Sequence, residues 1–516
     1  MTSTYVLIHN NIMSRTYDRH IQDIVNYIFH YKIDDQKAYR SARSALLDAI
    51  GCAIETASKS KECESLLGPV IRGTTVPNGF KVPGTNHQLD PVKGAFDLGV
   101  LIRYLDHNDA LGGAEWGHPS GRSHFLVTPL ANCLTTITDN LAAILAVADW
   151  LSRESIAGDY THIGPPLTMR TLLTALIKAY EIQGCYQMRN AFNKFSIDHV
   201  ILVKLASAAV VSWLLGLTEE QTMATISHVW MDGHPSRVYR SGTNTIPRKG
   251  WAGGDASMRA VHLALLVRAG QPGAPRALSA SPWGFLQRTF GDEGFELPRP
   301  FGTWTIQHVL FKVMPVEGHG ISAVEAALVQ RQQLQHAGMG PQNIQRMHIR
   351  TTEAAALIIN KQGPLYNAAD RDHCIQYLVA LALLKGQPPE VEDYQDGSRW
   401  ANSEELTALR NKIIVRADDK LTSDYHDLDK KSIGSALTIE LRNGASLSEV
   451  TVEYPVGHVQ NPRTAHAVHE KFWKNMRLMF SEGQIREIVR ATEDGDMKIN
   501  YFVDLISPQQ SSRCRF

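Results

Sequence analysis

Apolar residues recur at steps of three and four along most of residues 18–270. Two clear runs are Ile144, Leu145, Ala148 and Leu151, and then Leu205, Ala209, Val210 and Trp213. This spacing places the apolar side chains on one face of an α-helix. Thr218 followed by Gln221 is typical of a capping box, which begins a further helix. The first half of the chain is therefore predicted to be helical.

The pattern changes in residues 305–455, which read as a smaller α+β domain. Two strands are predicted at 309–313 and 347–352, a helix at 321–338 and a hairpin at 436–454. Gly338 is expected to end the helix, and Asn443 with Gly444 to form the hairpin turn. Helical periodicity returns from residue 466 onward.

Length and charge restrict the class of protein. A chain of 516 residues is expected to form more than one domain. Lys plus Arg and Asp plus Glu number 52 each, so no overall field favours nucleic acid or an anionic membrane. No apolar run reaches the ~20 residues that span a bilayer. The first 17 residues carry one Arg and no acid, so we expect a cytoplasmic protein, with a mitochondrial one as the alternative.

The six cysteines are scattered along the chain without a Cys-x-x-Cys pair. This spacing argues against a disulfide framework, a zinc ribbon or a ligated iron–sulfur cluster. No cofactor and no metal are therefore expected. Any acid–base chemistry must then come from side chains.

Residues 103–120 hold the densest group of chemically active side chains. Asp106 and Asp109 precede a Gly-Gly turn, and Glu115 and His118 follow it. Acids and an imidazole brought together at a turn suit proton transfer. The alternative interpretation is a buried loop whose polar groups only satisfy one another.

Several sequence blocks resemble those of the MmgE/PrpD family, from residue 18 to about residue 480. They include Val-Pro-Asn-Gly-Phe-Lys-Val-Pro-Gly-Thr (76–85), Ala-Glu-Trp-Gly-His-Pro-Ser (114–120), Val-Leu-Phe-Lys (309–312), Ala-Asp-Arg-Asp-His-Cys-Ile-Gln-Tyr (369–377) and Val-Glu-Tyr-Pro-Val-Gly-His (452–458). The resemblance implies a mainly α fold, in which a large all-helical domain carries an inserted smaller α+β lid domain. The resemblance implies an N-terminal tail at 1–17 and a helical domain made of residues 18–304 and 456–516. The lid domain lies between these two parts, at 305–455.

The resemblance also implies a function, the dehydration of 2-methylcitrate or a longer 2-alkylcitrate by a metal-independent hydro-lyase. A homodimer acting on a small tricarboxylate is expected. Decarboxylation of cis-aconitate, an activity of other family members, is one alternative. A catalytically inactive relative that acts as a binding protein is the other.

The family's active-site positions can be carried over residue by residue. They are Asp106, His118, His199, Lys249, Lys312 and His319. We expect His118 and His199 to transfer protons, Lys249 and Lys312 to anchor carboxylates, and Asp106 to orient a histidine. Weaker candidates for substrate binding are Arg237, Arg240, Arg371, His373 and Ala110, of which the first four could equally be ion pairs at a domain interface.

Two departures from the family pattern affect these expectations. Small residues replace larger ones at Ala110, Gly112, Gly113, Gly318 and Gly320. Their lost volume predicts a larger pocket for the alkyl group, unless neighbouring side chains fill the space. The second departure is residues 121–138, which separate two family blocks and are expected to be either a retained intron or a genuine insertion.

Overall fold

The computed structural model describes residues 16–113, 134–135, 137–158, 160–190, 192–240, 245–291 and 295–508. Within these residues the fold is mainly helical. The helices of the first part are α1 Arg19–His30, α2 Gln36–Lys59, α3 Lys61–Glu64, α4 Pro91–Arg103, α5 Asn140–Ala157, α6 Met169–Arg189, α7 Val200–Leu214, α8 Glu219–Met231, α9 Arg248–Arg268 and α10 Phe285–Phe290. Two short antiparallel pairs join β1 Phe80–Lys81 to β2 Gln88–Leu89, and β3 Leu111–Gly112 to β4 Leu134–Thr135.

Helices in this part follow the predicted pattern. Helix α7, with an almost entirely apolar sequence, is buried on nearly all sides, as expected for a core helix rather than a membrane span. Thr218 and Gln221 form the predicted capping box at the start of α8. None of the helices in the described residues has both the length and the apolarity needed to cross a membrane.

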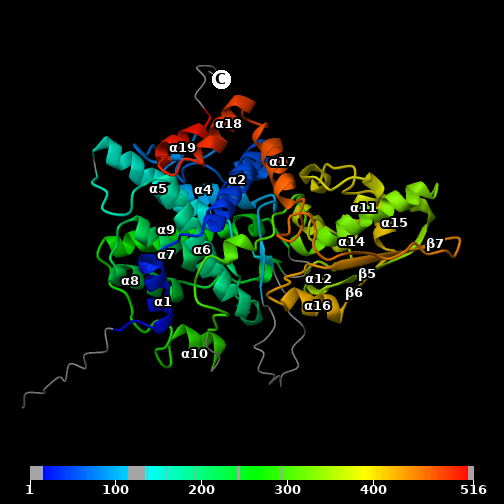
Figure 1. Ribbon diagram of the computed structural model, residues 1–516, viewed down its shortest axis with the longest axis horizontal. Coiled ribbons are helices and arrows are strands. Elements are labelled where there is room, and N and C mark those ends of the chain that lie inside the picture. Colours follow the sequence, from blue (N-terminus) through cyan, green and yellow to red (C-terminus); the bar gives the residue numbers. More distant parts are fainter. Residues whose placement is uncertain are drawn as a thin grey trace, which may run out of the picture.

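The second part is built on one mixed sheet. Its elements are α11 Ile321–His336, β5 Ile344–Thr351, α12 Glu353–Ile358, α13 Ala368–Arg371, α14 Ile375–Lys385, α15 Glu404–Arg410, β6 Ile413–Ala417, α16 Asp419–His426, β7 Ser435–Leu441 and β8 Val450–Val452. The strand order is β6-β5-β7-β8, with β5 parallel to β6 and antiparallel to β7. In Figure 1 this part stands to one side of the helices of the first part.

Most predicted elements of the second part are confirmed. The helix ends before Gly338, which has the left-handed φ of 67° expected for a helix-terminating glycine. The hairpin of β7 and β8 is also present, with Gly444 in its turn at φ 84°. The predicted strand at 309–313 is wrong. There Leu310 forms only an isolated bridge with Ala110, because no second strand continues the ladder on either side.

Three C-terminal helices return to the first part of the structure. They are α17 Thr464–Met476, α18 Glu482–Ala491 and α19 Ile499–Leu505. Phe472, Met476 and Phe502 belong to the same buried core as the N-terminal helices, whereas residues of the sheet and of α11 and α14 form a second core. Figure 1 shows α17 beside α2 and α18 and α19 on the same side.

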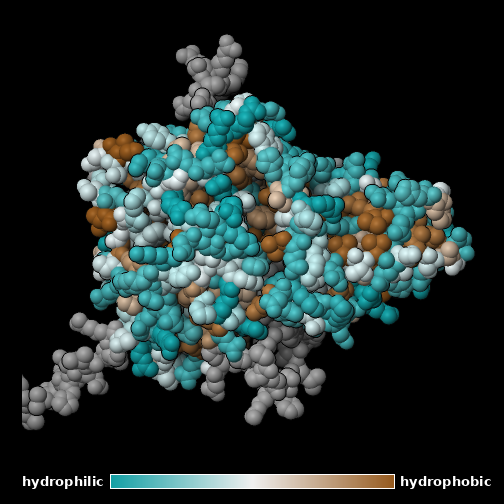
Figure 2. All heavy atoms as spheres, in the orientation of Figure 1, coloured by the Kyte–Doolittle hydropathy of each residue, from teal (hydrophilic) through white to brown (hydrophobic). Residues whose placement is uncertain are grey.

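The face of the molecule drawn in Figure 2 is mostly hydrophilic. Figure 2 shows one face of the molecule, on which hydrophobic residues form small patches separated by hydrophilic ones. The chemically informative groups are therefore expected inside the molecule rather than on this face.

Candidate active site

A close crossing of α4 and α9 positions the first residues of the site. A Cβ atom built on Gly99 would lie 2.5 Å from Cα of Gly254, so only glycine permits this approach of the two helices. At the end of α4, Tyr104 lies against Gly250 in the same way. The crossing therefore brings the loop after α4 to the first turn of α9, where Lys249 is located.

Asp106, in that loop, is fully buried among cations. Its backbone has a φ of 54°, a left-handed conformation that aspartate tolerates better than most residues. Nζ of Lys312 donates a hydrogen bond to its Oδ1 at 2.8 Å and to its carbonyl oxygen at 3.1 Å. Arg103 also binds Oδ1, and Nζ of Lys249 lies 3.7 Å from Oδ2. Asp106 thus holds two lysines and an arginine together.

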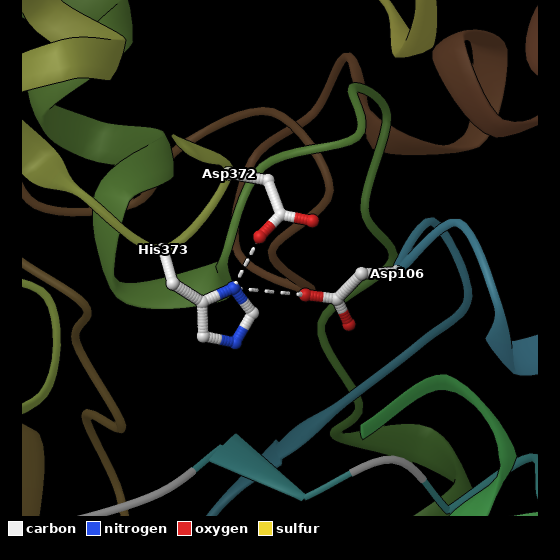
Figure 3. A group of neighbouring side chains, drawn as sticks. All are labelled: Asp106, Asp372 and His373. Carbon is white, nitrogen blue, oxygen red and sulfur yellow. Dashed lines mark hydrogen bonds and ion pairs between the residues drawn. The ribbon is translucent and has the colours of Figure 1, made fainter. Parts of the chain in front are cut away.

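Asp372 and His373 reach the same cluster from the second part of the structure. They lie between α13 and α14. Nζ of Lys249 donates to Oδ2 of Asp372 at 2.7 Å, and Nδ1 of His373 lies 2.6 Å from Oδ1 of the same carboxylate. Figure 3 shows the carboxylates of Asp106 and Asp372 on two sides of Nδ1 of His373, with the Asp106 Oδ2 atom at 3.9 Å.

The protonation states in the cluster follow from burial and charge. Burial opposes the ionisation of Asp106, but Arg103, Lys312 and Lys249 hold its pKa well below the usual range. Burial lowers the pKa of His373, and the ammonium group of Lys249 lowers it further. The cluster at neutral pH therefore combines ionised carboxylates, cations and a neutral imidazole, the last of which can accept a proton.

His319 joins the cluster through Glu317. Its Nδ1 lies 3.1 Å from Oε1 of Glu317, and its backbone N–H donates to Oε2 of the same residue at 2.9 Å. The backbone N–H of Glu317 in turn donates to the carbonyl of Asp372 at 3.2 Å. Burial opposes ionisation of Glu317, but His319, His373 and Lys312 lower its pKa to about 2.

His199 lies in a neighbouring group centred on Asp198. Its Nδ1 is 3.2 Å from Oδ1 of Asp198, whose other oxygen pairs with Arg240 at 2.9 Å and Arg237 at 3.4 Å. Burial places the pKa of His199 well below its usual value, and the positive charges of Arg240, Arg237 and Arg103 lower it further. His199 is therefore a neutral imidazole at neutral pH.

Three of these groups have the geometry of metal ligands. Oxygen or nitrogen atoms of Asp106, Asp372 and His373 lie within 4.8 Å of one another. However, the ammonium group of Lys249 contacts the Asp372 carboxylate and lies near that of Asp106. A divalent cation would have to displace this charge or bind beside it, at a cost in repulsion. The donor set thus fits an internal ion-pair network better than a metal centre.

A narrow pocket leads to this cluster. Its volume is about 70 Å³, and it is lined by Lys249 and Asp372 together with Tyr104, Tyr394 and residues 367–369. A larger cavity of about 1130 Å³ lies beside His107 and α17. The larger cavity borders none of the residues of the Asp106 cluster, so we place the chemistry at the narrow pocket.

The structure places the sequence-predicted residues in different surroundings. Asp106, Lys249, Lys312 and His373 meet directly. His319 reaches them through Glu317, whereas His199 pairs with Asp198, whose partner Arg240 donates to the Lys249 carbonyl at 3.4 Å. Arg237 and Arg240 pair with Asp198, and Arg371 donates to the Tyr394 carbonyl at 2.7 Å and to Asp396 at 2.6 Å. His118 and Glu115 lie outside the described residues.

Asp109 and Ala110 form hydrogen bonds with neighbouring parts of the fold rather than with the Asp106 cluster. Tyr180 donates to Oδ2 of Asp109 at 2.7 Å, and the Thr138 backbone N–H donates to Oδ1 at 3.1 Å. Burial raises the pKa of Asp109. Ala110 exchanges two backbone hydrogen bonds with Leu310, which joins the loop to the chain near Lys312.

The predicted enlargement of the pocket is wrong at three of the glycines. A Cβ at Gly112 would meet the ring of Tyr425 at 3.0 Å, and one at Gly113 would meet Gln187 at 2.8 Å. At Gly320 the space is taken by Leu378, at 2.9 Å. Neighbouring side chains thus fill the volume, which was the alternative left open by the sequence.

Asp372, Glu317 and Arg103 are site residues that the sequence reasoning missed. Asp372 directly precedes His373 in a block already noted, and Arg103 lies three residues before Asp106. In both cases the sequence could have indicated the residue, because it lies close along the chain to a predicted site residue with which it can form an ion pair. For Glu317, the indication was its position two residues before His319, close enough to bind both the backbone and the ring of that histidine.

Together, the fold and the cluster define a mainly helical protein with a buried acid–base site at the junction of two cores. The MmgE/PrpD N-terminal domain matches residues 22–122 and 130–298, and the MmgE/PrpD C-terminal domain matches residues 314–494. The chain belongs to the MmgE/PrpD family.

Curated relatives match over nearly the full chain. An alkylcitrate dehydratase of a fungal species is 60% identical, covering 96% of this chain and 94% of that protein. An alkylcitrate dehydratase of Talaromyces stipitatus is 54% identical, covering 95% and 97%. A 2-methylcitrate dehydratase of Salmonella typhimurium is 45% identical, covering 95% and 97%.

The expected insertion at 121–138 overlaps a gap in the family match. Within the N-terminal domain this match is interrupted at 123–129. At the other end of the segment, Ile137 and Thr138 are fully buried, and Thr138 binds Asp109. The last residues of the expected insertion therefore contact the folded protein. The choice between a retained intron and a genuine insertion stays a prediction.

Proposed function

We propose that the chain dehydrates 2-methylcitrate or a longer 2-alkylcitrate to the corresponding cis-aconitate-type alkene. The observation that carries this proposal is the buried cluster in which Lys249, Lys312 and the Asp372–His373 pair meet around Asp106. Relatives of 45–60% identity that are named as dehydratases of these compounds support the choice of substrate.

The reaction needs both cations and titratable groups. A proton leaves a carbon next to a carboxylate, while the hydroxyl group departs from the neighbouring carbon as water. Negative charge then develops on a carboxylate that is already ionised, so fixed cations must face it. Lys249 and Lys312 are buried ammonium groups with this charge, and we assign them to the substrate carboxylates.

We assign a proton transfer to His373. Because Nδ1 faces the Asp372 carboxylate at 2.6 Å, it carries the proton in the neutral ring, and Nε2 keeps its lone pair. The lowered pKa of His373 leaves this nitrogen free to accept a proton at neutral pH. His199 is a second neutral imidazole nearby. The role expected for His118 stays a prediction, as does the division of acid and base among the histidines.

We further propose that residues 305–455 act as a lid over the helical domain formed by 18–304 and 456–516. The return of α17, α18 and α19 to the first core supports this division. The narrow pocket supports the lid, since sites for ligands of drug-like size occupy about 300–1,000 Å³, whereas this pocket holds about 70 Å³. Opening between the two cores would admit a tricarboxylate.

The homodimer and the cytoplasmic location remain predictions, with a mitochondrial location as the alternative. The family relatives include a mitochondrial 2-methylcitrate dehydratase of Yarrowia lipolytica, 44% identical over 95% of this chain. Light scattering of the purified protein would give the mass in solution. Fractionation of cells with an antibody against the chain would give the compartment.

The proposed function is tested by supplying substrate to the purified chain. We expect 2-methylcitrate, 2-butylcitrate or 2-hexylcitrate to produce the ultraviolet absorbance of a conjugated alkene. Release of carbon dioxide from cis-aconitate, without dehydration of any of the three, would instead identify a decarboxylase. Binding of these compounds in a calorimeter without either reaction would identify an inactive binding protein.

A further inference from the structure

Tyr425 of α16 lies against the glycine turn that follows the Asp106 loop. The ring is 1% exposed. A Cβ atom at Gly112 would lie 3.0 Å from Cε2 and 3.0 Å from the hydroxyl oxygen of Tyr425. Any side chain at position 112 would therefore displace this ring, whereas glycine leaves room for it.

The hydroxyl group of Tyr425 faces His319. It lies 3.4 Å from Nε2 of the histidine, a long hydrogen bond. On the other side of the ring, Nδ1 is 3.1 Å from the Glu317 carboxylate, so this nitrogen carries the proton when the ring is neutral. Nε2 is then an acceptor, and the tyrosine hydroxyl is its donor.

The chain of contacts continues from His319 into the site. The backbone N–H of Glu317 donates to the Asp372 carbonyl at 3.2 Å, directly before His373. His373 and Lys312 are among the groups that lower the pKa of Glu317. Glu317 therefore contacts His319 on one side and the chain next to His373 on the other.

Lys431 holds the same segment in place. Its Nζ donates to the carbonyl oxygen of Gly112 at 2.8 Å and lies 5.4 Å from the centre of the Tyr425 ring. The ammonium group thus ties the loop after α16 to β3 and adds a cation–π contact to the ring. Ring, glycine and lysine form one packed unit beside His319.

We propose that Tyr425 is a positioning residue of the dehydration reaction, because its hydroxyl group orients His319 and its place beside the site depends on glycine at position 112. This inference rests on the proposed function for its catalytic consequence. Its structural part, the contact between Tyr425 and His319, can be tested without turnover.

Tyr425→Phe removes the hydroxyl group and keeps the ring. We expect kcat with 2-methylcitrate to fall about tenfold, while KM changes by less than about twofold, because the substrate carboxylates keep their lysines. Tyr27→Phe is the matched control. Tyr27 is also a buried tyrosine, and its hydroxyl donates to the Gly302 carbonyl at 2.6 Å, away from the site. Equal kcat values for the wild type and Tyr425→Phe would overturn the proposal.

The dependence on glycine has its own test. Gly112→Ala should lower kcat by a similar factor, because the methyl group displaces the hydroxyl of Tyr425. In the double variant Gly112→Ala with Tyr425→Phe, kcat should be no lower than in either single variant, since both changes remove the same contact. Fully additive losses would show that the two residues act independently and would contradict the proposal.

Nitrogen-15 spectra of histidine side chains separate this inference from the proposed function. With the His319 signal assigned from His319→Gln, its Nε2 resonance should move in Tyr425→Phe and stay in place in Tyr27→Phe. This holds even if no 2-alkylcitrate is dehydrated, an outcome that would refute the proposed function alone. An unmoved Nε2 resonance in Tyr425→Phe would refute the positioning role.

Discussion

Nζ of Lys249 lies 2.7 Å from the carboxylate of Asp372, and this ion pair joins α9 of the first core to the α13–α14 connection of the second. Both side chains are almost fully buried. Since the two charged partners are contributed by different parts of the structure, the acid–base cluster is complete only when these parts meet.

Loss of the Lys249 charge should chiefly weaken substrate binding. We expect Lys249→Ala to raise KM for 2-methylcitrate about 10- to 100-fold, because a charge-assisted hydrogen bond to a carboxylate contributes about 1.5–3 kcal/mol. Lys204→Ala removes another buried lysine, which pairs with Asp232 at 2.9 Å outside the cluster. Steady-state kinetics of both variants, with thermal unfolding to verify the fold, tests the assignment. A normal KM in Lys249→Ala would remove it from the binding site.

Substrate binding should take up protons. Three cations, Arg103, Lys249 and Lys312, already face three anions, Asp106, Asp372 and Glu317. A bound tricarboxylate adds negative charge to this balanced cluster, which raises the pKa of His373 from its lowered value. Calorimetry in buffers of different ionisation enthalpy would measure the uptake. A binding enthalpy that is the same in every buffer would contradict it.

Acid should destabilise the protein through Glu55, which supports the Asp106 loop from α2. Burial opposes its ionisation, but His107, at 2.7 Å, and the ammonium groups of Lys59 and Lys471 lower its pKa to about 2. In the unfolded chain this glutamate has an ordinary pKa, near 4.3. Between this pKa and the folded-state pKa of about 2, the unfolded state binds more protons than the folded state. The stabilisation is therefore complete above about pH 5 and is lost as the pH falls toward 2.

Glu55→Gln should accordingly lower the free energy of unfolding by about 2–3 kcal/mol at pH 7. The difference from the wild type should shrink as the pH falls through 4. Glu487→Gln, at an exposed glutamate, is the control. Urea unfolding at several pH values gives these free energies, and a difference that stays constant down to pH 3 would contradict the ionisation argument.

Catalysis should not depend on a metal ion. The Asp106, Asp372 and His373 donors meet, but Lys249 contacts the same carboxylates. We expect activity to survive prolonged dialysis against a chelator, with the metal content measured by mass spectrometry. Loss of turnover on chelation, recovered when iron or another divalent metal is added, would show that the lysine gives way to a cation.

Local patterns predicted much of the fold. The capping box at Thr218, the helix ended by Gly338 and the hairpin at Gly444 each depend on residues close in sequence, and all are present. The strand at 309–313 was wrong because a β-type run needs a pairing partner. That partner is set by the tertiary structure, which the run itself does not encode.

The site was predicted in part, for a similar reason. Family resemblance found Asp106, Lys249 and Lys312, which meet in space. The prediction of a larger pocket was wrong at Gly112, because Tyr425 fills the space that the glycine leaves. Tyr425 lies more than 300 residues later in the chain. Contacts of this kind between distant segments cannot be read from either segment alone.

The central claim is that the cluster around Asp106 dehydrates 2-alkylcitrates, with His373 as a proton-transfer group. The direct test compares alkene formation from 2-methylcitrate by the wild type and by His373→Gln, with His348→Gln, at a histidine of β5 paired with Glu440, as the control. We predict that the wild type and the control produce the alkene, and that kcat of His373→Gln falls by ~10² or more at little changed KM. An undiminished kcat in His373→Gln would contradict the account.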